Sequence, residues 1–171
     1  WYLNGTSILD TNNKYSGHSS LYSDGSGYAS LANKSELIIG LSDYSISFNY
    51  KPTSLLNWRT PFQKGIWNES GALTLIVGTS SIKICTSGTD SGDISHGMSI
   101  NNWYHVALSR TNGICRLFIN GVLKSTFAQP QNINNVSDIE LMRGGGIVGP
   151  DIGYIDNFTY IVGKCIYYHE F

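Results

Sequence analysis

The stretch NNWYHVALSRTNGICRLFINGVLKSTF, residues 101–127, contains three runs typical of β-strands and two readable turns. The runs at residues 103–110 and 114–120 are rich in aromatic, β-branched and other apolar side chains, and Thr111-Asn112-Gly113 between them tolerates a positive φ. Asn120-Gly121 then precedes a third run at residues 122–127, and an Asn-Gly pair is the strongest short-range signal for a type I′ turn. The stretch therefore predicts a three-stranded antiparallel meander.

The first strand of this meander has no clearly polar side. Trp103, His105 and Ala107 share one face, and the other face carries Tyr104, Val106 and Leu108. A strand covered on both faces belongs in the interior of a sandwich. We therefore expect Trp103 to lie in the core and His105 to be a core histidine hydrogen-bonded to the backbone.

The rest of the chain also consists of short strand-like runs. No stretch of a dozen residues keeps the apolar stripe of a helix, and Gly recurs too often to permit one. Short strands separated by turn clusters are typical of an all-β sandwich or barrel. We expect strands near residues 19–22, 28–31, 44–51, 66–67, 73–77, 81–86, 139–142 and 153–161, and a loop at residues 53–64.

Several of these residues form a pattern that resembles a known family. Trp103, His105-Val106-Ala107, Arg110 and Asn120-Gly121 look like the laminin-G-like, or concanavalin-A-like, jelly-roll lectin domains. GHSSLY at residues 17–22 and GYIDNF at residues 153–158 match in the same order, so the resemblance spans most of the chain. It implies an all-β fold, a two-sheet antiparallel jelly-roll sandwich. The closing run, residues 154–171, is similar to the version found in phage tail and virion proteins and in some bacterial surface proteins.

The length and composition of the chain fit one domain and argue against nucleic-acid binding and membrane insertion. A chain of 171 residues is the size of a single domain, and because it opens at Trp1 with no Met or leader, we expect residues 1–171 to be one domain cut from a longer protein. Charged residues make up 13% of the chain, with 11 basic against 12 acidic and no Lys/Arg run, so nucleic acid is not an expected partner. No apolar run is long enough for membrane insertion.

The chain contains three cysteines, Cys85, Cys115 and Cys165, and an odd number cannot all pair within one chain. Each follows or precedes apolar strand-like residues, so we expect all three to be reduced and to behave as small hydrophobes. The alternative is one Cys85–Cys115 disulfide across neighbouring strands. Reduced cysteines would suit a protein assembled in the cytosol, such as a virion component.

Catalytic groups are not apparent in the sequence. Relatives of the resembled fold include glycoside hydrolases with paired carboxylates at alternate positions of one strand, and no such pair is present. Asp90 and Asp93 lie three residues apart in a Gly/Ser loop, and Glu69 and Glu140 are isolated. The four histidines show no metal-ligand spacing. We therefore expect a protein that is not an enzyme.

The resemblance implies a structural calcium ion, because many members of the fold hold Ca²⁺ between an early Asp-Gly turn and a late Tyr-Ile-Asp strand. The matching positions are Asp24-Gly25 and Asp156, and Asp151 is a third candidate ligand. Calcium takes six to eight oxygen ligands, so backbone carbonyls or water would complete the shell. Asp24-Gly25 is also an ordinary turn sequence, and Asn157 stands where relatives often carry a second acid.

Aromatic residues beside amides and charges indicate a carbohydrate site. Sugar rings stack on Trp and Tyr, while Asn, Asp and Arg satisfy their hydroxyls. The candidate ligand-binding residues are Trp58 with Arg59 and Trp67 with Asn68. Trp67 follows a strand-like Gly-Ile and has a core position as its alternative.

The resemblance implies non-catalytic recognition of a glycan or host-surface receptor by a phage or virion surface or tail protein. The expected location is the virion surface or the extracellular space, and the parent protein is a candidate homo-oligomer. Two alternatives stay open. One is a bacterial surface adhesin or carbohydrate-binding module, and the other is a structural assembly domain without a ligand, in which Trp58 packs on a neighbouring subunit.

Overall fold

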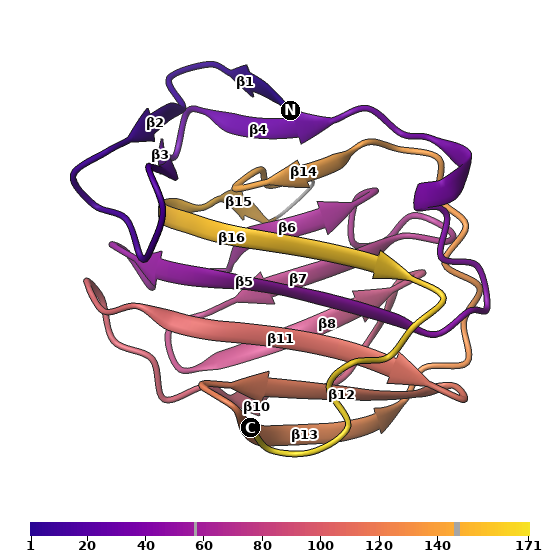
Figure 1. Cartoon of the computed structure of the whole chain (residues 1–171). Coiled ribbons are helices and arrows are strands. Elements are labelled where there is room, and N and C mark those ends of the chain that lie inside the picture. Colours follow the sequence, from indigo (N-terminus) through magenta and orange to yellow (C-terminus); the bar gives the residue numbers. More distant parts are fainter. Residues whose placement is uncertain (57, 146–147) are drawn as a thin grey trace.

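Two β-sheets stack face to face in the computed structural model, which describes residues 1–56, 58–145 and 148–171 (Figure 1). The strands are β1 (Tyr2–Asn4), β2 (Ile8–Asp10), β3 (Ser20–Asp24), β4 (Tyr28–Leu31), β5 (Tyr44–Pro52), β6 (Arg59–Lys64), β7 (Leu73–Val77), β8 (Ser81–Thr86), β9 (Thr89–Asp90), β10 (Ile94–Ser95), β11 (Tyr104–Thr111), β12 (Ile114–Ile119), β13 (Val122–Ala128), β14 (Ile139–Leu141), β15 (Gly149–Pro150) and β16 (Ile152–Val162). One 3-10 turn, η1 (Ser35–Leu37), follows β4. The predicted all-β, two-sheet jelly-roll sandwich is confirmed.

The two sheets differ in size. The seven-stranded sheet has the order β13-β12-β11-β5-β16-β3-β2. The nine-stranded sheet has the order β1-β4-β14-β6-β7-β8-β10, with β9 added beside β8 and β15 beside β6. The β15–β6 pair is parallel and the other pairs are antiparallel. No helix in the described part of the chain is long and apolar enough to cross a membrane.

The predicted meander forms as β11, β12 and β13. Asn112 and Asn120 adopt the positive φ angles that their turns require, at 50° and 51°. β11 pairs with β12 on one side and with β5 on the other, which places Val106 between Ile119 and Phe48. The turn residues thus set the register that aligns the apolar faces.

The main core lies between the sheets. On β5 the inward residues Ile46, Phe48 and Tyr50 are at most 1% exposed, as their alternation predicts. Phe62 and Leu75 of the nine-stranded sheet face the same core and are equally buried. Each fully buried large apolar side chain of this kind contributes roughly 1.5–3 kcal/mol to folding.

The outer face of the seven-stranded sheet is partly covered by the C-terminal segment, residues 163–171, which crosses it in Figure 1. The Ser45 hydroxyl donates to the Lys164 carbonyl and accepts from the Ile166 amide, and the Ser109 hydroxyl donates to the Tyr167 carbonyl. This covering explains why Ser45 and Ser47, polar residues on the outward face of β5, are buried. Cys165 belongs to the C-terminal segment and is buried. All three cysteines are unpaired, and Cys85 and Cys115 lie in separate apolar clusters.

Arg110 is a structural residue. Its side chain is 1% exposed, and its guanidinium donates to the carbonyls of Gly40, Ser42 and Gln131 and lies 5.1 Å from the ring centroid of Tyr44. A buried cation satisfied by carbonyl groups ties two distant loops to β11.

Four expectations from the sequence are wrong. His105 is half-buried beside Tyr167 and Phe171 instead of lying in the core. Residues 59–64, expected in a loop, form β6 in the centre of the nine-stranded sheet, and residues 66–67 form a turn instead of a strand. The strand tolerates Pro61 because the register to β7 shifts between Arg59 and Phe62, and Pro61 accepts the Met142 amide with its carbonyl. Trp103 precedes β11 and is half-buried outside the core, against Tyr15 and Tyr154.

Candidate functional site

A small apolar cluster lies on the outer face of the nine-stranded sheet, separate from the main core. It consists of Ile76 on β7, Cys85 on β8 and Val148, with Trp67 packed against them. Strand alternation places these side chains outward, because Leu75, Val77 and Ile84 beside them point into the core. The cluster gives this face an apolar floor.

Trp58 and Trp67 meet on this floor, although nine residues separate them in the sequence. Both line one hollow of about 150 Å³, together with Ile76, Lys83 and Val148. Trp58 is 38% exposed and Trp67 is half-buried, so the hollow presents aromatic surface to solvent. The two tryptophans, which the sequence offered as separate candidates, therefore line the same hollow.

The backbone around Trp58 holds its ring in place. The Gly149 amide donates to the Trp58 carbonyl at 3.0 Å, and Gly149 pairs with Arg59 in the parallel β15–β6 ladder. On the far side of the ring, a Cβ at Gly78 would lie 2.9 Å from the nearest Trp58 ring carbon. Only Gly at position 78 therefore allows the indole to pack against β7's end without a shift.

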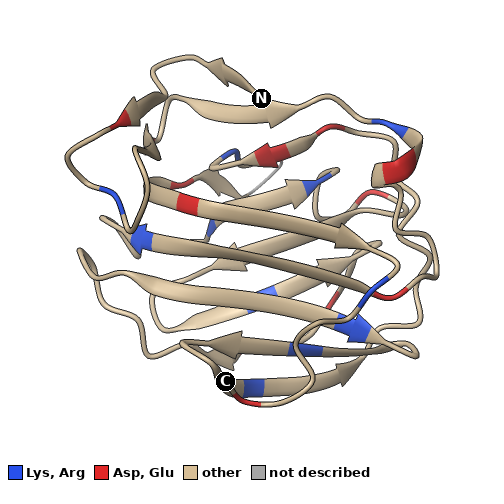
Figure 2. Ribbon diagram, viewed as in Figure 1, with Lys and Arg blue, Asp and Glu red and all other residues tan. Residues whose placement is uncertain are grey.

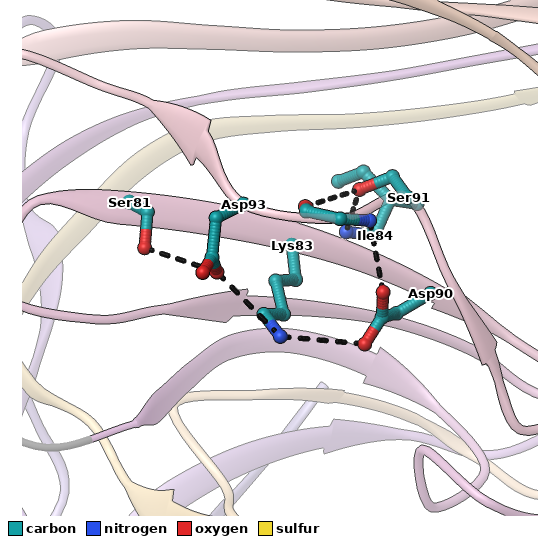
Figure 3. Close-up of polar contacts among 7 residues, drawn as sticks. Ser81, Lys83, Ile84, Asp90, Ser91 and Asp93 are labelled. Carbon is teal, nitrogen blue, oxygen red and sulfur yellow. Dashed lines mark hydrogen bonds and ion pairs between the residues drawn. The ribbon is translucent and has the colours of Figure 1, made fainter.

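Two carboxylates, Asp90 and Asp93, hold the Lys83 ammonium (Figure 3), which lies over the Trp58 ring. Its Nζ lies 5.0 Å from the Trp58 ring centroid, 3.4 Å from Asp90 Oδ2 and 3.5 Å from Asp93 Oδ1. The Ser81 hydroxyl donates to Asp93, and the Gly92 amide donates to Asp90, which fixes both carboxylates. Desolvation opposes the charge of Lys83, but Asp90 and Asp93 outweigh it and raise the pKa of the ammonium.

The other two predicted ligand-binding residues do not line this hollow. Arg59 donates its Nε to the Leu56 carbonyl and its Nη1 to the Pro150 carbonyl at 2.8 Å, so its side chain braces the Trp58 loop. Asn68 is exposed in the turn after Trp67. Sequence reasoning missed Lys83, whose signal was its outward position between the buried Ile82 and Ile84.

A second, polar hollow of about 330 Å³ lies on the same sheet. Its lining includes Gln63, Glu69, Asp138, Glu140 and Arg143. The Gln63 amide donates to Glu140 at 2.6 Å, and Arg143 forms an ion pair with Glu140. No local pattern indicates that Glu69 and Glu140 line one hollow, because β14 and the turn after β6 become neighbours only in the folded sheet.

The three predicted calcium ligands are not gathered into one set. Asp24 accepts the Thr6 hydroxyl and the Ser26 amide, and Asp156 Oδ2 accepts the amides of Tyr15 and Ser16, each at 2.9 Å. In residues 1–56, 58–145 and 148–171, no group of three or more His, Cys, Asp or Glu side chains is placed to hold a metal ion. The side chains thus do not fit the predicted calcium shell.

Asp151 is enclosed beneath the Trp58 region. It is fully buried, its Oδ1 accepts the Ile152 amide, and the Tyr50 hydroxyl lies beside its carboxyl group. Burial raises the pKa of Asp151 to about 7, an effect that Tyr50 and the charge of Arg59 only partly offset. Asp151 is a buried acid, not an exposed ligand.

Comparison with known proteins identifies the fold. The model of the concanavalin A-like lectin/glucanases superfamily matches residues 23–159. No curated protein sequence matches the chain.

Solved structures that resemble the chain include several binding domains. Domain 4 of AbnA, a GH43 extracellular arabinanase from Geobacillus stearothermophilus in complex with arabinotriose, has 19% identity and a TM-score of 0.72, over 96% of this chain and 82% of that one. The CBM40 of the Ruminococcus gnavus IT-sialidase, bound to α2,3 sialyllactose, has 19% identity and a TM-score of 0.60, over 81% and 90%. The binding domain of botulinum neurotoxin DC in complex with rat synaptotagmin II has 18% identity and a TM-score of 0.68, over 96% and 43%, so this chain spans less than half of it. At these identities the likeness shows a shared fold.

Proposed function

The chain belongs to the concanavalin A-like lectin/glucanases superfamily, and from this premise we propose that it is a non-catalytic module that binds a glycan in the hollow between Trp58 and Trp67. One observation carries the proposal. Two tryptophans from separate segments, Trp58 and Trp67, are brought to one solvent-facing hollow whose rim holds a fixed cation and carboxylate, Lys83 and Asp90.

This arrangement suits the chemistry of a sugar. The indole rings offer apolar surface to the C–H face of a pyranose or furanose ring. Lys83 donates hydrogen bonds and Asp90 accepts them, and with Asp93 they place one cation between two carboxylates at the rim. Because both are already held in place, little side-chain entropy is lost when a ligand binds.

The similar structures support the same class of ligand. Two of them contain an oligosaccharide, arabinotriose in one and sialyllactose in the other. The third binds a protein receptor, so a host-surface receptor is the alternative partner. Neither the arabinanase domain nor the sialidase CBM40 assigns a particular sugar to this chain.

The biological setting we propose is attachment to a host cell by a phage or virion surface protein, outside the cell. Its support is the closing sequence run, residues 154–171, and three reduced, buried cysteines that suit assembly in the cytosol. A bacterial adhesin or carbohydrate-binding module would use the same hollow in another parent protein.

A glycan array with the purified chain and its Trp58→Ala variant tests the binding proposal. The matched control is Tyr2→Ala, because Tyr2 is a 68% exposed aromatic on β1, at the opposite edge of the same sheet. We expect binding that Trp58→Ala weakens at least about tenfold, roughly 1.4 kcal/mol, and that Tyr2→Ala leaves unchanged. An array with no bound glycan, beside a wild-type oligomer that Trp58→Ala dissociates, would favour the assembly alternative.

Calcium binding stays a prediction that the same array can test. Running it in calcium and in a chelator, beside thermal melts in both buffers, separates the two cases. Unchanged binding and melting temperature would agree with the dispersed positions of Asp24, Asp151 and Asp156. A higher melting temperature in calcium would mean that backbone carbonyls complete a site around one of them.

The hydrolase alternative has a specific location, the polar hollow with Glu69, Asp138 and Glu140. These carboxylates already accept protein donors, among them the Ile66 amide on Glu69 and the Asn33 amide on Asp138. We expect no release of reducing sugar from polysaccharides. Release that disappears in Glu140→Gln would overturn the non-catalytic proposal.

A further inference from the structure

A second aromatic surface lies on the outer face of the seven-stranded sheet. The Trp103 ring centroid is 5.9 Å from that of Tyr15 and 6.2 Å from that of Tyr154, and Tyr154 is 4.8 Å from Tyr22. These four residues come from four separate segments of the chain. Ile155, the residue after Tyr154 on β16, points into the core. Because side chains alternate along a strand, Tyr154 and the row it belongs to face outward.

A hollow of about 440 Å³ opens beside this row. It is lined by Tyr15, Trp103, His105, Asn120, Gly121 and Phe171, and we call it the Trp103 groove. It is larger than the Trp58 hollow. No Asp, Glu, Lys or Arg belongs to its lining, and burial lowers the pKa of His105, which keeps the imidazole neutral near pH 7.

The aromatic residues of the groove are not there only to complete the core. Tyr15 is 55% exposed, although burying such a side chain would stabilise the fold. An exposed apolar patch rimmed by polar groups marks an interaction site in a monomer. In Figure 2 the seven-stranded sheet, which faces the viewer, carries few charged segments.

The groove is also held in shape before any ligand arrives. Asp156, an 8% exposed residue of β16, accepts the backbone amides of Tyr15 and Ser16 with one oxygen, which anchors the Tyr15 loop on the sheet. Asn120 Oδ1 accepts the His105 amide at 2.8 Å, so the Asn120 amide group is fixed. Its Nδ2 donates to no residue in the described ranges. Because Asn120 lines the groove, this group is a hydrogen-bond donor for a ligand.

We propose that the Trp103 groove is a second carbohydrate-binding site, which takes an uncharged, linear oligosaccharide along Tyr15, Trp103 and Tyr154. Successive aromatic rings suit successive sugar rings of one chain. Asn120 and His105 supply polar groups for hydroxyls. A sialylated or sulfated chain is disfavoured at the Tyr15 and Trp103 end of the row, where the groove lining holds no cation, whereas at the other end Lys51 Nζ lies 5.4 Å from the Tyr154 ring centroid.

This site does not depend on the Trp58 hollow. The two lie on the outer faces of opposite sheets, so a single sugar ring cannot fill both. A branched or repeating polysaccharide that reached both sites, on one chain or two, would gain avidity without any new contact.

Fluorine NMR of the whole chain labelled with 5-fluorotryptophan tests the proposal, because each of the four tryptophans gives its own signal. The probes are arabinotriose and lactose, with α2,3 sialyllactose as the charged partner of lactose. We expect a neutral probe to shift the Trp103 signal in a saturable way, and sialyllactose to do so more weakly than lactose.

Two variants make the result specific to the groove. Tyr15→Ala should weaken the titration seen at Trp103 roughly threefold to tenfold, as loss of one aromatic contact predicts. Tyr168→Ala, a 50% exposed aromatic of the C-terminal segment outside the groove lining, should leave it unchanged.

The outcomes separate this proposal from the one before it. Neutral probes that shift only Trp58 and Trp67 would overturn the Trp103 groove and leave the Trp58 hollow standing. A saturable shift at Trp103 alone would do the reverse. No shift at Trp103 with either neutral probe, sialyllactose binding as tightly as lactose, or a Tyr15→Ala titration equal to wild type would each overturn the proposed neutral-sugar site.

Discussion

The meander of β11 to β13 and the Trp58 hollow contrast in what their residues do. Arg110 of the meander is 1% exposed, and its guanidinium donates hydrogen bonds to backbone carbonyls. Trp58 and Lys83 of the hollow are partly exposed. Lys83 lies over the Trp58 ring and forms an ion pair with Asp90. Arg110, one of the residues that resemble the family, thus builds the fold, whereas Trp58 and Lys83, which match no family pattern, build the Trp58 hollow. Stability and ligand affinity should therefore respond to separate substitutions.

Arg110→Ala should give the largest effect, and it should be an effect on stability. The substitution removes a 1% exposed side chain from beside Tyr44 and takes a charged donor from the carbonyls of Ser42 and Gln131. Hydrogen bonds to charged groups contribute roughly 1.5–3 kcal/mol each, so we expect a loss of about 3 kcal/mol. Urea unfolding measures this loss. Glycan affinity per folded molecule should be unchanged, and a loss of affinity with little loss of stability would break the contrast.

Asp151→Asn tests whether an acid buried beneath the site acts on the fold alone. Asp151 has a folded pKa of about 7 against an ordinary value of 3.8, so the folded state holds its proton while the unfolded state loses it. Stability should therefore fall as pH rises from about 4 to about 7, by up to a few kcal/mol. The Asn variant should lose this part of the pH dependence in urea unfolding between pH 5 and pH 8.

An Asp151→Asn protein with the wild-type pH profile would show that the carboxyl is solvated in the folded chain. Glycan affinity should stay constant over the same pH range in both proteins. A parallel fall in affinity would mean that Asp151 and the Trp58 loop are coupled through Arg59.

Gly78→Ala should move Trp58 without removing it. The new Cβ would lie 2.9 Å from the ring, so the indole must shift, and overpacking of this kind costs roughly 1–3 kcal/mol. We expect affinity at the hollow to fall roughly threefold to tenfold in a calorimetric titration. Thr79→Ala is the control, because Thr79 follows Gly78, is exposed and does not line the hollow; equal losses in both would argue against a fixed ring.

Lys83→Gln should give the smallest effect. The ion pairs are exposed and contribute roughly 0.2–1 kcal/mol each, so stability should change little. The substitution removes the positive charge over the Trp58 ring and replaces the ammonium with a weaker, neutral hydrogen-bond donor. A two- to fivefold loss of affinity is expected. An unchanged titration would leave the tryptophans as the only contributors in the hollow.

Much of the fold could be predicted from local signals. The Asn-Gly turn, the alternation of Ile46, Phe48 and Tyr50, and the lack of a helical stripe each specify local geometry, and the structure agrees. β6 was missed because Pro61 is a signal against a strand, and only the shifted register to β7 makes room for it. Such a bulge depends on partners that are distant in the sequence.

The site was less predictable for a related reason. Composition indicated that Trp58 and Trp67 would be exposed, but sequence cannot say which strand residue lies over a ring, so Lys83 was missed. Trp103 was placed in the core because its strand lacked a polar face. In the structure the C-terminal segment covers only part of that sheet, and Trp103 lies outside the covered part with Tyr15 and Tyr154.

The most direct measurement is a crystal structure of the chain with the glycan that binds most tightly on the array. The account predicts a sugar ring in van der Waals contact with Trp58 or Trp67, and a hydroxyl hydrogen-bonded to Lys83 or Asp90. A glycan bound instead between Glu140 and Asp138, or a second copy of the chain covering Trp58 with the hollow closed to sugar, would contradict it.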